Sequence, residues 1–114
     1  MRKLLVVGLL SALPATLLAA GPALSARKHV EVDDNYFVRE GRGTPTVRVQ
    51  RNDTVVWEWE GRNPHNVTVT EGPVKFRSRT KSSGTYRKRV TRRGSYRIVC
   101  TIHAGMRMRL RVLR

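Results

Sequence analysis

The segment from Met106 to Val112 constrains the fold of this chain more than any other. Every second residue in it is apolar, and each residue between is an arginine. An alternation with a period of two is typical of a β-strand that has one face in a hydrophobic core and the other in water. This segment therefore predicts a half-buried strand near the end of the sequence.

The same period recurs in shorter runs along residues 30–100, and Gly, Pro, Asn and Asp separate the runs. No stretch has the period of a long amphipathic helix. The least regular part is 75–85, where we expect a short strand around Phe76 followed by a loop or one helical turn. Six to eight short strands in about 88 residues predict an all-β fold, an antiparallel β-sandwich of Greek-key type with about seven to eight strands.

The amino-terminal residues 1–26 have the pattern of a secretory signal peptide. Arg2 and Lys3 precede an apolar run, and small residues follow it up to a cleavage site near residues 25–26. The alternative is a retained membrane anchor, but the run from 4 to 18 is short for a bilayer span, which needs about 20 residues. We therefore expect one domain, residues 27–114, that is exported to the periplasm or the extracellular space.

Soft and borderline metal ligands gather in one short motif. The single cysteine, Cys100, is followed by His103, Met106 and Met108, and a second imidazole is available at His65. Two His, one Cys and a weak axial Met are the ligands of a blue-copper electron-transfer site. Taken alone, Cys100 could also be a buried inert thiol or an intermolecular bridge, and His65 could be an ordinary loop histidine.

Other chemistries have less support in the sequence. It has no Ser/His/Asp set, no phosphate-binding Gly-rich loop and no Cys-x-x-Cys-His for covalent haem. One Cys and two well-placed His are also fewer ligands than a zinc site usually has. We therefore expect a protein that is not an enzyme.

Three segments resemble the cupredoxin family, nearest to plastocyanin, pseudoazurin and amicyanin. They are Pro64-His65-Asn66-Val67, the run from Gly94 to His103, and Asp53-Thr54-Val55-Val56-Trp57. Their order and the 35-residue gap from His65 to Cys100 make the combination specific. The resemblance covers about Val30 to Val112 and implies an eight-stranded β-sandwich with copper at one end. The chain departs from the family at the position before the second histidine, where the family often has proline and this chain has Ile102.

The resemblance also implies roles for individual residues. It implies that His65, Cys100 and His103 bind one copper ion, and that Asn66 and Thr101 tie the two ligand loops together. The axial ligand is Met106 if the loop is short, as in amicyanin, or Met108 if it is longer, as in pseudoazurin. The number of residues after Met106 suits the short loop better, which favours Met106 as the axial ligand. Around His103 we expect a small apolar docking patch formed by Pro64, Ala104 and Gly105.

The charge distribution indicates which partners the chain can attract. The formal net charge is +15, all eight acidic residues lie between Glu31 and Glu71, and residues 72–114 carry fourteen Lys or Arg. Such a field steers association toward anionic partners. We expect an acidic redox protein, or an anionic membrane or cell-wall surface, while export argues against nucleic acid. The alternative is that the arginines are only solvated surface charge. Their excess would then reflect the base composition of the genome.

The sequence therefore predicts a monomeric, exported blue-copper protein that carries single electrons between redox partners. One alternative is a copper-binding protein that buffers or delivers copper outside the cytoplasm with the same residues. Another is a metal-free module that binds polyanions and does not need Cys100.

Overall fold

The structure of the protein is a computed structural model, which describes residues 25–39 and 43–114. The predicted signal peptide therefore lies outside the described residues, apart from its last two, Ser25 and Ala26. Across these two ranges, no helix has the length and apolar character needed to cross a membrane.

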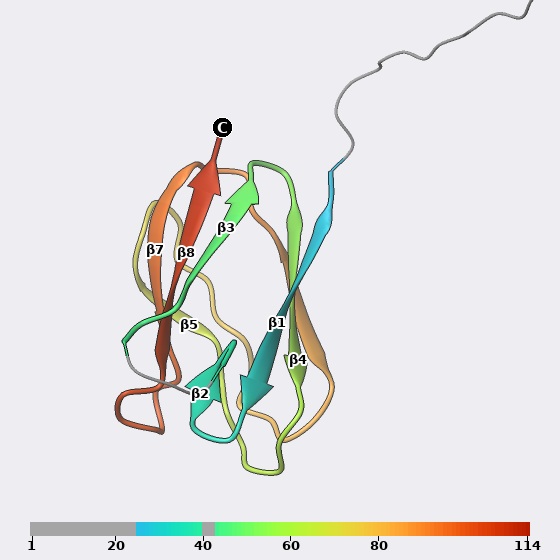
Figure 1. The fold of residues 1–114 in the computed structure, drawn as a ribbon, viewed down its shortest axis with the longest axis vertical. Coiled ribbons are helices and arrows are strands. Elements are labelled where there is room, and N and C mark those ends of the chain that lie inside the picture. Colours follow the sequence, from blue (N-terminus) through green and yellow to red (C-terminus); the bar gives the residue numbers. More distant parts are fainter. Residues whose placement is uncertain (1–24, 40–42) are drawn as a thin grey trace, which may run out of the picture.

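Within the described residues, eight β-strands form two sheets that pack face to face (Figure 1). The strands are β1 (Arg27–Asp33), β2 (Tyr36–Phe37), β3 (Thr46–Gln50), β4 (Thr54–Trp59), β5 (Thr68–Glu71), β6 (Thr85–Arg89), β7 (Gly94–Val99) and β8 (Arg107–Leu113). The first sheet has the order β2-β1-β4-β6 and the second the order β3-β8-β7-β5. This confirms the expected all-β sandwich.

The expectation of purely antiparallel pairing is wrong for two pairs of strands. β1 runs parallel to β4, and β3 runs parallel to β8, while the other four pairings are antiparallel. From β2 onward the chain changes sheet at almost every connection, so neighbours within a sheet are often distant in sequence. Such neighbours are not joined by a hairpin, so no tight turn imposes an antiparallel direction.

The strand expected around Phe76 is also absent from the described part of the chain. Arg77 makes only an isolated bridge with Thr68, and residues 75–85 contain no helical turn. The Phe76 ring packs instead against Trp57, with ring centroids 6.1 Å apart. The contact between the two aromatic rings holds Phe76 in place, so the segment around it does not need to form a continuous strand.

The core lies between the two sheets and follows the alternation seen in the sequence. In β8 the apolar residues are buried and the arginines are exposed, as predicted. Trp57 of β4 is fully buried, and its indole Nε1 donates a hydrogen bond of 3.5 Å to the sulfur of Met108. This contact joins the two sheets in the interior of the sandwich.

The residues of the predicted metal site lie at one end of the sandwich. The chain that follows β4 and the loop between β7 and β8 both lie at the end opposite the carboxyl terminus (Figure 1). His65 lies on the first of these segments, which crosses from one sheet to the other, and His103 lies on the second.

Candidate metal site

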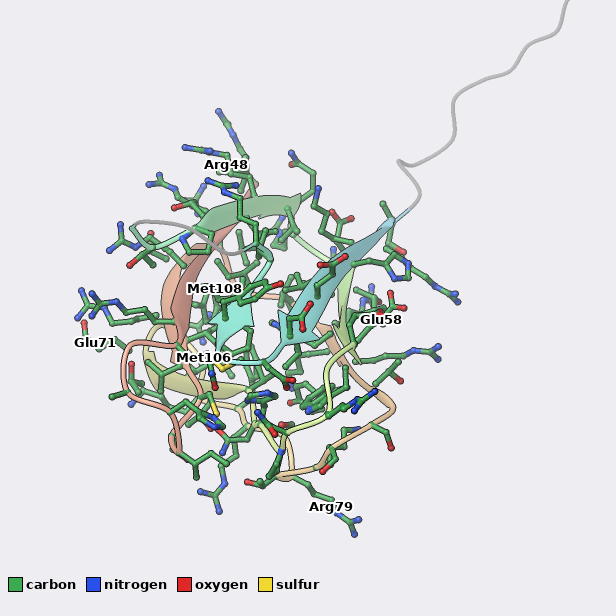
Figure 2. The ribbon with its side chains drawn as sticks, turned by 60° about the horizontal axis from the view of Figure 1, so that its bottom comes forward. Arg48, Glu58, Glu71, Arg79, Met106 and Met108 are labelled. Carbon is green, nitrogen blue, oxygen red and sulfur yellow. The ribbon has the colours of Figure 1, made fainter. Side chains whose placement is uncertain are left out.

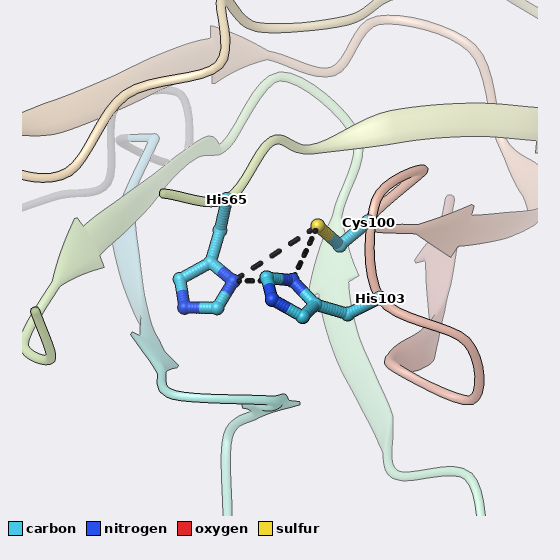
Figure 3. A group of neighbouring side chains, drawn as sticks. All are labelled: His65, Cys100 and His103. Carbon is cyan, nitrogen blue, oxygen red and sulfur yellow. Dashed lines mark hydrogen bonds between the residues drawn. The ribbon is translucent and has the colours of Figure 1, made fainter. Parts of the chain in front are cut away.

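The side chains of His65, Cys100 and His103 converge on one point (Figure 3). The Cys100 sulfur lies 3.5 Å from Nδ1 of His103 and 4.0 Å from Nδ1 of His65, and the two Nδ1 atoms are 3.1 Å apart. His65 and Cys100 are buried, while His103 is half-buried. Two imidazoles and a thiol thus present three ligand atoms to a common centre, with only His103 reaching the surface.

These distances fit a metal ion bound by all three atoms. Bonds of about 2.0 Å to nitrogen and 2.3 Å to sulfur, at angles near 110–120°, place neighbouring ligand atoms about 3.3–3.7 Å apart. The three measured separations scatter around these values. A His₂Cys set in this arrangement is the equatorial ligand set of a blue-copper site.

The loop between β7 and β8 places Cys100 and His103 by its own hydrogen bonds. The Cys100 N–H donates to the Met106 carbonyl at 3.0 Å, and the Met106 N–H donates to the His103 carbonyl at 3.2 Å. Gly105 has a φ of +83°, a left-handed conformation that glycine adopts without strain. The loop is therefore a short closed turn that directs the imidazole back toward the thiol.

A contact with Asp34 holds the imidazole of His65 from its other side. His65 Nε2 donates to Asp34 Oδ1 at 3.1 Å. A carboxylate can only accept, so the proton must be on Nε2, and the lone pair of Nδ1 faces Cys100. Asp34 therefore fixes the tautomer that metal binding requires. Nothing in the sequence distinguishes this aspartate from an ordinary turn residue.

Asp34 is itself held by the chain that follows β4. Its carboxylate accepts backbone N–H groups of Asn63 at 2.9 Å and Arg62 at 3.0 Å. These two bonds, followed by the contact with His65, hold the pKa of Asp34 below its usual value. A Cβ atom on Gly61 would collide with the carboxylate of Asp34, so only glycine lets the two segments approach this closely.

Asn66 and Thr101 join the two ligand-bearing segments. The Asn66 side chain donates to the Thr101 hydroxyl at 2.9 Å and accepts the Thr101 backbone N–H at 3.2 Å. The Asn66 backbone N–H also points at the Cys100 sulfur, at 3.5 Å. A hydrogen bond to sulfur stabilises the thiolate form, which is the form that binds metal.

The two candidate axial methionines differ in their register along the sheet. Both are fully buried, Met108 on β8 and Met106 just before this strand begins (both labelled in Figure 2). Met108 lies opposite Ile98 in the β7–β8 pair, whereas the backbone of Met106 bonds directly to Cys100. The Met108 sulfur accepts the bond from Trp57. Met106 is therefore paired with Cys100 through the backbone, and Met108 lies two residues further along the chain, within β8.

Exposed apolar residues flank His65 and His103 in the sequence and add apolar surface at the metal end of the sandwich. Pro64, Ala104 and Gly105, the residues of the predicted docking patch, are all exposed. Ile102 is 50% exposed and is the one large hydrophobic residue among the described residues that faces solvent to this degree. In the sequence Ile102 stands out only as a departure from the family, and its side chain enlarges this apolar surface.

The third histidine, His29, lies away from these ligands. It is exposed on β1, and its Nδ1 contacts the Glu58 carboxylate on β4. Of the His, Cys, Asp and Glu residues in the described ranges, only His65, Cys100 and His103 form a group that could hold a metal ion.

Fold and ligand set together define a small metalloprotein with one site for a soft metal. Residues 29–113 match the family described as copper binding proteins, plastocyanin/azurin family. The chain belongs to this family, and its cofactor is copper. No curated protein matches the sequence.

Solved structures share the fold. A Cu(I) structure of an amicyanin mutant is 25% identical, with a TM-score of 0.59, over 75% of this chain and 80% of that one. The reduced form of a second amicyanin mutant is 26% identical with the same TM-score, over 74% of this chain and 79% of that one. The similarity to these neighbours supports a copper-binding electron-transfer protein.

A larger protein also contains this fold. The Cu-containing nitrite reductase NirK from Thermus scotoductus SA-01 has a TM-score of 0.66 and 21% identity over 88% of this chain. The present chain spans about a quarter (25%) of the length of that reductase. At this identity the likeness concerns the fold alone.

Proposed function

We propose that the protein is an exported carrier of single electrons, with one copper ion bound by His65, Cys100 and His103 and with Met106 as the axial ligand. The observation that carries the proposal is the convergence of these two imidazoles and the thiol, whose ligand atoms all lie within 4.8 Å of one another. Copper bound there supplies the change between Cu(I) and Cu(II).

Each residue has a defined task in this proposal. Cys100 binds as a thiolate, favoured by the N–H of Asn66, and His65 binds through the nitrogen that Asp34 leaves unprotonated. The bonds between Asn66 and Thr101 keep the two loops at a constant separation. Because the ligands are held by hydrogen bonds of the fold, little has to move when the charge of the site changes.

Partners would approach at the His103 end. His103 is the one ligand of the three that is not buried, and Pro64, Ile102, Ala104 and Gly105 offer apolar exposed surface beside it. A small apolar patch suits brief docking of a redox protein, and the basic surface favours an acidic one. The amino-terminal pattern supports export to the periplasm or the extracellular space, with residues 1–26 removed as a signal peptide.

The decisive experiment is spectroscopic. The protein would be purified after export from a bacterial host, its amino terminus would be determined by mass spectrometry, and Cu(II) would be added. We expect an intense blue thiolate-to-copper band, an unusually small copper hyperfine splitting, and reversible one-electron cycling with the metal retained. A colourless or ordinary tetragonal site would contradict the proposal, and rapid loss of copper to an acceptor would favour copper delivery.

The two methionines provide a matched pair of variants. We expect Met106→Leu to raise the reduction potential and change the blue spectrum, because the axial ligand tunes the potential of such sites. Met108→Leu should leave both unchanged and lower only the thermal stability, through loss of the contact with Trp57. Electrochemistry and thermal unfolding of both variants check this, and the reverse pattern would assign the axial position to Met108.

A further inference from the structure

The outer face of the second sheet is an array of arginines that contributes no ligand to the proposed copper site and lies outside the proposed apolar docking patch. Five exposed side chains form it, Arg48 on β3, Arg97 on β7, and Arg107, Arg109 and Arg111 on β8. We call these five residues the arginine face. Figure 2 shows Arg48 extending away from the sandwich into solvent.

Like charges lie directly opposite one another in this face. Arg97 pairs with Arg109 across β7 and β8, and Arg48 pairs with Arg111 across β3 and β8. Neighbouring strands are about 4.8 Å apart, so these pairs repel and destabilise the sheet. Of the acidic residues that the structure describes, only Glu71 joins this sheet, and its carboxylate contacts Arg97 at 3.3 Å. An external anion would relieve the repulsion.

The charges are segregated between the two sheets. On the first sheet, Glu31, Asp33 and Glu58 accompany the basic residues, and Glu58 lies on the opposite side of the molecule from Glu71 (Figure 2). The strands of the second sheet, with five arginines and one glutamate, therefore carry the larger excess of positive charge. An uneven charge distribution of this kind orients the protein against an anionic surface.

Two hollows on this side are lined by guanidinium groups. One, of about 240 Å³, is bordered by Arg97, Arg107 and Arg109. The other, of about 690 Å³, is bordered by Arg93, Arg111 and Arg114. The planar fork of arginine matches the oxygen atoms of a phosphate, so three guanidinium groups around a small hollow form a suitable environment for a phosphate group.

The face has the arginines that protein interfaces also use, but it lacks an exposed large apolar residue. Interface centres between proteins are enriched in aromatic residues and Met as well as in Arg. The one exposed large hydrophobic residue in the described ranges, Ile102, lies instead at the metal end. A flat sheet face with regularly spaced cations is complementary to a flat surface of anionic headgroups, where each Arg or Lys near the surface contributes to attraction.

We infer that the arginine face docks the protein on an anionic phospholipid bilayer through the phosphate groups of its lipids. The strands that bear the face run along the side of the sandwich, and the β7–β8 loop, which carries His103, lies at one end of it (Figure 1). A docked molecule would therefore keep its metal end free for a redox partner. The protein would then move along the membrane surface between its partners.

Binding to vesicles tests this inference. The exported protein would be sedimented with vesicles of phosphatidylglycerol and phosphatidylcholine, and with vesicles of phosphatidylcholine alone, with and without copper. We expect binding to the anionic vesicles only, weakened by salt and independent of copper. The double variant Arg109→Gln/Arg111→Gln should bind about 25-fold more weakly, since one arginine near the surface is worth about fivefold.

The control changes the net charge equally on the other sheet. Arg87 and Arg89 are exposed on β6, so Arg87→Gln/Arg89→Gln also removes two charges. We expect this variant to lose less than about threefold in affinity. Equal losses in the two double variants would show that only net charge matters and would overturn the inference. Failure to bind anionic vesicles at low salt would also overturn it, as would preferential binding of an acidic protein at this face.

Discussion

Replacing Cys100 with serine will abolish the intense visible band of the copper-loaded protein. The band requires a covalent bond between copper and a thiolate, and the described residues contain one cysteine, which is buried beside the two imidazoles. A serine oxygen is a harder ligand and does not lose its proton readily. We expect a complete loss of the band, together with the larger hyperfine splitting of ordinary copper, in absorption and paramagnetic resonance spectra.

The appropriate control is His29→Ala. His29 is exposed on β1 and contacts Glu58, so its loss should leave the copper spectrum unchanged. A Cys100→Ser protein that stays blue would exclude the proposed ligand set. A folded Cys100→Ser protein that binds copper with undiminished affinity would show that the thiol is a core residue only.

Replacing Asp34 with alanine will lower the copper affinity by about 10- to 100-fold, the usual cost of removing the partner that orients a ligating histidine. Without the carboxylate, His65 loses the acceptor of its Nε2–H, and the N–H groups of Arg62 and Asn63 lose theirs. The imidazole can then rotate and change tautomer. Competition with a chelator of known affinity measures the change.

The conservative variant Asp34→Asn separates charge from orientation. Its amide oxygen can still accept from His65, so we expect most of the affinity to remain. The loss of one negative charge beside the site should raise the reduction potential, because that charge stabilises Cu(II) more than Cu(I). Glu60→Gln removes a nearby exposed charge without touching His65 and should leave the potential almost unchanged. An equal rise in both variants would contradict a specific role for Asp34.

The parts of the site that could be predicted best from the sequence are the local ones. Cys100, His103 and Met106 lie within one short loop, so their spacing nearly determines their proximity. The alternation in β8 likewise predicts its buried face, because a strand allows only two faces. His65 could be predicted as a ligand only from the order of motifs that the chain shares with the cupredoxins. No local feature of the sequence shows which loop histidine faces the thiol.

The parts that could not be predicted depend on tertiary register. Asp34 reaches His65 across 31 positions, and its turn looks like any Asp-rich turn until the two segments meet. Facing alone could not separate Met106 from Met108, and our proposal of Met106 rests on its backbone bond with Cys100, which appears only in the folded chain. The parallel pairings of β1 with β4 and of β3 with β8 were missed for the same reason, because no short-range signal marks them.

The central position of β8 has a consequence for how the chain folds. β8 follows the other seven described strands in the chain, yet it lies between β3 and β7, and both pair with it along most of their length. The second sheet therefore cannot assemble before residues 107–113 exist, and the long separation of β3 from β8 makes their pairing slow. The nascent polypeptide therefore stays incompletely folded until residues 107–113 have been synthesised, which is compatible with the export before folding that we propose.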